Sequence, residues 1–152
     1  EKFPKMKQYG DKIETKDDQS ISYEKIKEVL TANPNIAAIQ GSAMADVAGA
    51  ALAVEELGLA GKVKIVGTSL VSVSGKYVRE GTIDMISFWD PALAGKAMIA
   101  LAQKVLDGEK IESGLDLGIE GYSNLTLDGK VLTGQAWVDV TKDNVDDPAY
   151  NF

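Results

Sequence analysis

Four stretches of the chain combine apolar residues at helical spacing with signals for the start or end of a helix. They begin at Ser22, Asp46, Ser74 and Pro91, and they are closed by Asn33-Pro34, Gly58, Gly81 and Gly108, respectively. Pro in the first turn and Gly past the last turn are the usual residues at helix ends, so the fourth stretch has both signals. The pattern therefore predicts four helices within the first 108 residues.

Shorter runs before and between these helices predict strands. They cover residues 6–14, 36–42, 63–70 and 82–90. The runs at 36–42 and 63–70 are apolar without alternation, which is typical of strands buried on both faces of a parallel sheet. Strands separated by helices form right-handed βαβ units, so we expect an α/β fold with a doubly wound, Rossmann-like parallel sheet.

The chain beyond Gly108 has a different pattern. Its residues predict short extended segments, with turns at Asp128-Gly129 and Thr133-Gly134. Two aromatic residues of this tail, Tyr122 and Trp137, are expected to pack within it. The tail is therefore distinct from the alternating part.

Composition excludes several classes of function. The formal charge is −7 and the sixteen Lys and Arg residues are scattered, which argues against a nucleic-acid partner. The chain has neither His nor Cys, so imidazole bases, thiol nucleophiles and nearly all transition-metal sites are excluded. No apolar run reaches the length of about 18 residues that a membrane-spanning helix needs. We expect neither a metal nor a cofactor.

Three candidate chemistries can be tested against their motifs. The segment from Gly41 to Gly49 resembles a phosphate loop, but a dinucleotide fingerprint needs Gly at Ala43 and Asp46. The acidic pairs at 17–18 and 146–147 are expected to be solvated, and 143–147 lacks the central Gly and terminal Glu of a calcium loop. Ser69 lacks the closing Gly of a nucleophile elbow and has no His to activate it. Its hydroxyl bonds either local backbone or a ligand.

The predicted strand ends are the places where such a sheet binds ligands, because crevices form beyond the carboxyl ends of parallel strands. Trp89 and Asp90 stand at one of these ends, directly before Pro91. Asp90 can cap the following helix. An indole beside a carboxylate also suits a sugar, whose C–H face packs on the ring while its hydroxyls donate to the carboxylate. We favour the ligand role for the pair.

Four blocks of the sequence resemble a known family. The segment from Gly10 to Gly58, VGTSL, SFWDPALAGKAM and WVDVTKDNVD are similar, in this order, to the C-terminal part of type I periplasmic sugar-binding proteins. The nearest subgroup is the rhamnose and autoinducer-2 binding proteins of ABC importers. The resemblance implies a non-catalytic protein outside the cytoplasm that captures a small sugar-like ligand between two lobes for a membrane permease. Such a protein is either periplasmic or anchored at the cell surface as a lipoprotein. The alternative is a ligand-sensing core of a transcriptional regulator or a chemoreceptor partner with the same fold.

The resemblance also implies roles for parts of this chain. Residues 1–90 correspond to the ligand-binding C-terminal lobe without its start, and 91–152 to a crossing helix and tail that pack partly on a missing N-terminal lobe. We therefore expect the chain to be a fragment, and expect pairing between chains through the apolar helix 91–108.

The same resemblance identifies ligand-contacting positions. Gly41 and Ala43, with Ser42 between them, match a loop that touches ligand through backbone groups. Ser69 stands where many sugar binders carry an Asp, a departure that leaves the identity of the ligand open. Asp90 matches an acidic or amide residue at the crossing between lobes, and Trp89 is its aromatic neighbour.

Overall fold

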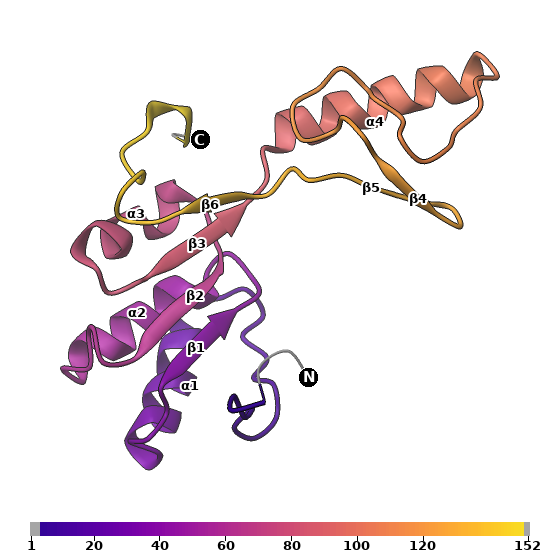
Figure 1. The fold of residues 1–152 in the computed structure, drawn as a ribbon. Coiled ribbons are helices and arrows are strands. Elements are labelled where there is room, and N and C mark those ends of the chain that lie inside the picture. The colour runs from indigo at the N-terminus through magenta and orange to yellow at the C-terminus, as the bar shows by residue number, and fades with distance from the viewer. Residues whose placement is uncertain (1–3, 151–152) are drawn as a thin grey trace. The chain divides into compact units, whose positions relative to one another are not determined.

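The computed structural model describes residues 4–150, which form two units (Figure 1). Unit 1 comprises Glu1–Ser87 and Asp139–Phe152, and unit 2 comprises Phe88–Val138. The division expected from the resemblance, between a ligand-binding lobe at 1–90 and a crossing helix and tail at 91–152, stays a prediction.

Unit 1 is built on a four-stranded sheet in the order β1-β2-β3-β6. Its strands are β1 (Ala38–Gly41), β2 (Lys64–Thr68), β3 (Met85–Phe88) and β6 (Val138–Val140). β1 pairs with β2 and β2 with β3, both in parallel, and α2 (Asp46–Glu56) and α3 (Val71–Glu80) connect them. This arrangement confirms the predicted α/β fold.

The first helix, α1 (Gln19–Ala32), begins three residues before the predicted start. Asp18 is the reason, because its carboxylate accepts hydrogen bonds from the backbone N–H groups of Ser20 (2.8 Å) and Ile21 (2.9 Å). The strand predicted at residues 6–14 is wrong: these residues form no strand. They contain Gly10 in a left-handed conformation, which interrupts an extended run.

The sheet of unit 1 is buried on one face. Ile65 and Ile86 have no exposed surface, whereas Val66 and Met85, which pair with each other in the register, are half-buried. Figure 1 shows α1, α2 and α3 together on one side of the strands. The expectation that 36–42 and 63–70 are buried on both faces is therefore wrong, because the helices of unit 1 form a single layer.

The helix layer is held by a close approach of α1 and α2 at Gly49. A Cβ at this position would lie 2.5 Å from the carbonyl oxygen of Gln19 and 2.6 Å from the Cβ of Ser22. Ser22 also donates a 2.8 Å hydrogen bond to the carbonyl oxygen of Asp46. Only glycine allows the two helix backbones to pack at this distance.

Unit 2 contains α4 (Pro91–Leu106) and a hairpin formed by β4 (Thr126–Asp128) and β5 (Val131–Thr133). Thr126 pairs with Thr133 and Asp128 with Val131, so the predicted turn at Asp128-Gly129 is confirmed. Of the described residues, none lies in a helix that is both long and apolar enough to span a membrane.

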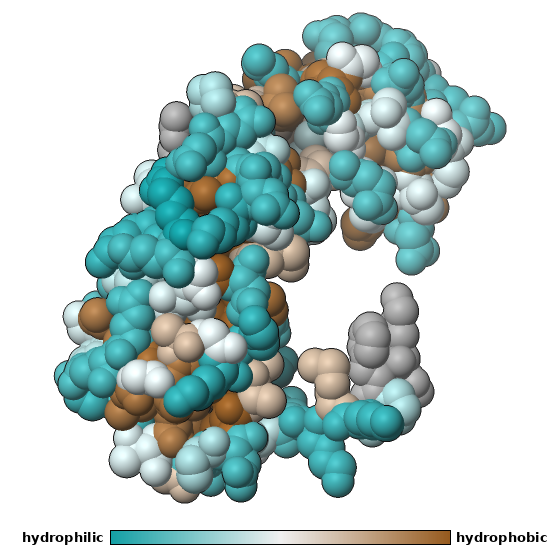
Figure 2. All heavy atoms as spheres, turned by 60° about the vertical axis from the view of Figure 1, so that its left-hand side comes forward, coloured by the Kyte–Doolittle hydropathy of each residue, from teal (hydrophilic) through white to brown (hydrophobic). Residues whose placement is uncertain are grey.

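Unit 2 buries little apolar surface. Phe88, Ala97 and Leu125 are buried, but α4 exposes several large apolar side chains: Met98, Ile99, Val105 and Leu106. Figure 2 shows apolar atoms, in brown, that reach the surface among hydrophilic ones. One side of α4 therefore has no packing partner among the residues of unit 2.

Candidate functional site

Two loops of unit 1 meet at the carboxyl edge of the sheet. Gly41 at the end of β1 pairs in the register with Gly67 near the end of β2, so the loops that follow lie side by side. A Cβ at Gly41 would lie 2.8 Å from both Cβ of Asp46 and Cγ1 of Val47. The glycine thus lets the β1–α2 loop, residues 42–45, fold tightly over the start of α2. This edge is where ligands bind in parallel α/β sheets.

Asp46 fixes the conformation of the β1–α2 loop. One carboxylate oxygen, Oδ2, accepts hydrogen bonds from the backbone N–H groups of Ser42 (3.0 Å) and Ala43 (2.8 Å). The N–H groups of these two predicted ligand-binding residues are therefore engaged within the protein. The carbonyl oxygen of Ala43 also accepts a 3.2 Å hydrogen bond from the backbone N–H of Asp46, so the exposed side chain of Ser42 is the part of the loop that is most open to a ligand.

The segment before α1 adds two further braces to the same loop. Thr15 donates its hydroxyl hydrogen to Oδ1 of Asp46, and Asp17 accepts a 2.9 Å bond from the backbone N–H of Ala45. Charge-assisted bonds of this kind are stronger than bonds between neutral groups. The loop is therefore held from two sides before any ligand arrives.

Ser69, at the end of β2, is buried, with 1% of its surface exposed. Its hydroxyl donates to the carbonyl oxygen of Met44 at 2.8 Å and lies 2.7 Å from the hydroxyl of Ser74. These bonds join the β2–α3 loop to the β1–α2 loop. The sequence left open whether the Ser69 hydroxyl bonds local backbone or a ligand. In the structure its acceptor is a backbone carbonyl, but one that lies 25 residues away in the chain. A direct ligand contact by Ser69 stays a prediction.

In unit 2, Asp90 is the N-cap of α4. Its Oδ1 accepts hydrogen bonds from the backbone N–H groups of Ala92 (2.7 Å) and Leu93 (3.2 Å). This confirms the capping role, which satisfies two of the free donors at the helix start. Both capping bonds end on Oδ1, so the other oxygen of the half-buried carboxylate is not needed for the cap.

Trp89 lies next to Asp90 and contacts Trp137. The two ring centroids are 5.4 Å apart and the ring planes are at 89°, an edge-to-face arrangement. The sequence placed Trp137 in the packing of the tail, which is wrong: its side chain is largely exposed and meets Trp89. Tyr122 is half-buried, in the tail, where it was expected. Trp89, Trp137 and Asp90 thus belong to one part of unit 2.

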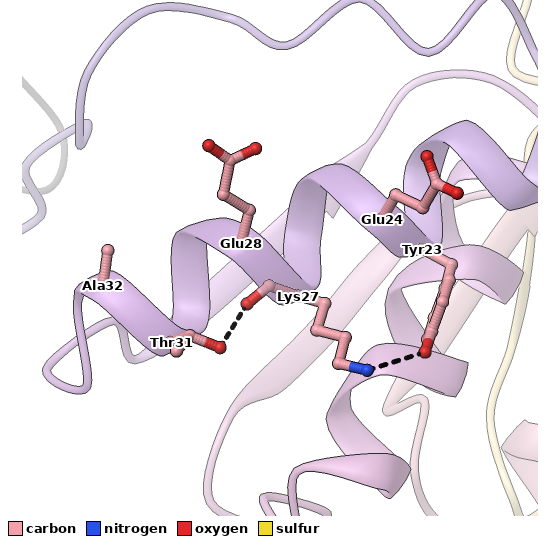
Figure 3. Close-up of a pocket in the computed structure, with 6 residues that line it drawn as sticks. All are labelled: Tyr23, Glu24, Lys27, Glu28, Thr31 and Ala32. Carbon is pink, nitrogen blue, oxygen red and sulfur yellow. Dashed lines mark hydrogen bonds between the residues drawn. The ribbon is translucent and has the colours of Figure 1, made fainter.

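A shallow hollow on α1 is lined by residues with a structural role. Figure 3 shows that its lining comes from a single helix. Lys27 on that helix forms a 2.6 Å ion pair with Glu56, and Tyr23 donates to the same carboxylate. These hydrogen bonds raise the pKa of Lys27 above its ordinary value and lower the pKa of Glu56. The cluster therefore joins α1 to α2, which is a structural role.

Within residues 4–150, no group of three or more His, Cys, Asp or Glu side chains is arranged to hold a metal ion. The structure thus places the six predicted site residues in two sets: Gly41, Ser42, Ala43 and Ser69 in unit 1, and Trp89 and Asp90 in unit 2. The sequence missed Asp46 and Trp137. Asp46 could have been noticed as an acidic residue just after a strand-end loop, whereas no local signal indicated the partner of Trp137.

Comparison with known families gives one clear match. A model described as the periplasmic binding protein domain matches residues 1–110, which is more than two thirds of the chain. A search of curated proteins found no significant match.

Solved structures give a consistent result. A sugar ABC transporter protein from Actinomyces odontolyticus is 25% identical with a TM-score of 0.76, and the alignment covers 92% of this chain and 45% of that one. LsrB from Clostridium saccharobutylicum, solved with AI-2, is 21% identical with a TM-score of 0.69 and coverages of 91% and 47%. A solute-binding protein from Clostridium phytofermentas, solved with L-rhamnose, is 19% identical with a TM-score of 0.70 and the same coverages. The chain spans less than half of the length of each of these proteins.

Proposed function

The chain belongs to the periplasmic binding protein domain family, and on that premise we propose that it is part of the solute-binding component of an ABC importer. The family acts outside the cytoplasm. In this proposal the protein captures a small sugar or sugar-like signal without chemical change and delivers it to a membrane permease. Anchoring as a surface lipoprotein is part of the same proposal.

The observation that carries the proposal is the edge of unit 1 where two strand-end loops meet. The β1–α2 and β2–α3 loops lie side by side because Gly41 and Gly67 are in register. Asp46 and Ser69 hold them with internal hydrogen bonds. A preformed, polar loop edge suits capture of a small polar ligand, since little ordering is needed when it binds.

We further propose that the ligand is bound between this chain and a second lobe. The aligned solved proteins are more than twice as long as the matched region. The half-exposed face of the unit 1 sheet and the apolar side of α4 are surfaces that additional chain can cover. The length of the aligned proteins and the uncovered surfaces both support a functional protein that contains a second lobe in addition to this chain.

For the ligand, we propose a rhamnose-like or AI-2-like molecule. The support is the fold shared with two proteins that were solved with L-rhamnose and with AI-2. The Ser at position 69 argues for a different set of hydroxyl contacts from that of binders with a carboxylate in this loop. We expect Gly41, Ser42 and Ala43 to contact the ligand through carbonyl and side-chain atoms, and Ser69 to act at this loop junction.

The test is isothermal titration of the two-lobed protein with L-rhamnose, AI-2, other deoxyhexoses and pentoses. We expect at least one compound to bind, and we expect that compound to be recovered from the protein without chemical change. Asp90→Ala is expected to weaken that binding by about 2–5 kcal/mol if the carboxylate is buried against the ligand. Asp90→Ser is the matched variant, because serine keeps a helix cap but lacks the carboxylate. No heat with any compound would contradict the proposal.

For the 152-residue chain alone, we propose self-association through α4. Met98, Ile99, Val105 and Leu106 leave an apolar surface on this helix, and burial of such a surface favours a second copy. Light scattering should report a dimer at high concentration. Leu106→Glu should restore the monomer, and a monomer in the unmodified chain at all concentrations would exclude the proposal.

A further inference from the structure

The two tryptophans of the chain form a pair that the fold of unit 2 does not bury. Trp89 has 46% and Trp137 58% of its surface exposed, although the rings contact each other edge to face. Indoles are among the largest apolar side chains, and they are well buried on average. A pair that served only to pack unit 2 would be expected to hide more of both rings.

The chain positions the pair through its neighbours. Ser87 donates a 2.6 Å hydrogen bond to Oδ1 of Asp139, and each tryptophan lies two residues along the chain from one of these residues. This bond joins the two segments two residues away from the tryptophans, whose rings meet edge to face.

Asp90 adds a fixed carboxylate beside the pair in the sequence. One of its oxygens is held by the first turn of α4, which orients the group. Trp89 and Trp137 thus offer exposed aromatic surface, and Asp90, the next residue along the chain from Trp89, offers an oriented hydrogen-bond acceptor. Apolar ring faces with a small number of placed polar groups are typical of sites for small ligands.

We propose that Trp137 is a sugar-contacting residue and forms, with Trp89, a two-sided aromatic wall for the C–H face and edge of a sugar ring. The two rings stand nearly perpendicular to each other and both are about half exposed, so each offers aromatic surface to a ligand. A saturated ring with C–H groups on one side and hydroxyls around its rim suits this surface, and a hydroxyl can donate to Asp90. The inference rests on the proposed function and adds a residue to its site.

The experiment is titration of the two-lobed protein and its variants with the compound from the panel above that binds most tightly. Trp137→Ala is expected to raise the Kd by about tenfold or more, because stacking on an aromatic ring contributes at this level. Trp137→Phe should restore most of the affinity. Val131→Ala, at another exposed apolar residue of unit 2, should leave the Kd unchanged.

A thermal melt of each variant separates ligand contact from packing. We expect Trp137→Ala to change Tm little without sugar and to lose much of the Tm increase that sugar produces in the unmodified protein. A lower Tm with an unchanged Kd would mean that Trp137 only packs against Trp89, and would overturn the inference while the proposed function stands. If the unmodified protein binds no compound, both proposals fail together.

Discussion

The two units of this chain differ in how completely each buries its apolar residues. In unit 1, α2 packs against α1 and the sheet, and residues such as Val47, Val54 and Ile86 have no exposed surface. In unit 2, α4 buries one residue, Ala97, and leaves Met98 and Ile99 in solvent. The same helix-forming pattern thus gives a packed element in one unit and an uncovered one in the other.

This difference shows where the chain depends on other surfaces. Apolar burial is the main favourable term in folding, so the unit 1 helix layer is expected to supply most of the stability of the isolated chain. α4 contributes less there, because its apolar side gains nothing until a partner covers it. The predicted site residues differ in the same way: those of unit 1 lie in loops that internal hydrogen bonds hold, whereas Trp89 of unit 2 has an exposed ring.

The largest expected effect comes from one substitution made in each unit. Ile86→Ala removes a fully buried side chain (0% exposed), and we expect it to lower the free energy of unfolding by about 2–5 kcal/mol. Ile99→Ala, at a residue that is 73% exposed, should change it by less than about 0.5 kcal/mol. Urea unfolding followed by far-UV circular dichroism at low protein concentration measures both. Equal losses would refute the contrast between the units.

Two helical glycines sharpen the comparison. A Cβ at Gly49 would collide with backbone and side-chain atoms of α1, so Gly49→Ala is expected to destabilise the chain by about 1–3 kcal/mol. Gly95 on α4 has no atom within 4 Å of an added Cβ, and Gly95→Ala should stabilise α4 by about 0.5–1 kcal/mol. Thermal unfolding gives the sign of each change. A stabilising Gly49→Ala would show that α1 and α2 are not closely packed in solution.

The sequence predicted the parts of the fold that depend on local signals. Gly81, at a left-handed C-cap, and Asp90, as an N-cap, end and begin helices by bonds within a few residues, and both predictions are confirmed. The strand predicted at residues 6–14 failed because a strand needs a pairing partner, which periodicity does not specify. Local chemistry alone does not give sheet membership.

The candidate site shows the same limit. The sequence could place Trp89 at a strand end, but the partner of that ring is 48 positions away and comes from the returning segment. The burial of the sheet on one face was also missed, since an apolar run looks the same whether a second layer covers it or not. Contacts between distant residues had to come from the structure.

The next effect concerns the brace under the unit 1 loop. Asp46→Ala removes the acceptor for the N–H groups of Ser42 and Ala43, and should cost about 1–2 kcal/mol and speed amide exchange at both residues. Asp116 in unit 2 is the matched control, because it accepts a single local bond from Gly118 at 2.7 Å. Asp116→Ala should leave exchange at Ser42 and Ala43 unchanged. Unchanged exchange in Asp46→Ala would mean that the loop is held by other bonds.

The smallest expected effect is the pH dependence of the ion pair between α1 and α2. The pKa of Glu56 is lowered by the hydrogen bonds from Lys27 and Tyr23, so its contribution to stability is present above its unfolded pKa. It is lost as pH falls through the lower, folded pKa. For Lys27 the pKa is raised, so its contribution is lost only as alkaline pH passes that raised value.

Urea unfolding of the unmodified chain and of Glu56→Gln should therefore differ at neutral pH and converge in acid. In a Lys27→Met background the same Glu56→Gln change should show a much smaller pH-dependent difference, because the main partner of the carboxylate is absent. A difference that persists unchanged in that background would assign the effect to Tyr23 or to the helix rather than to the ion pair.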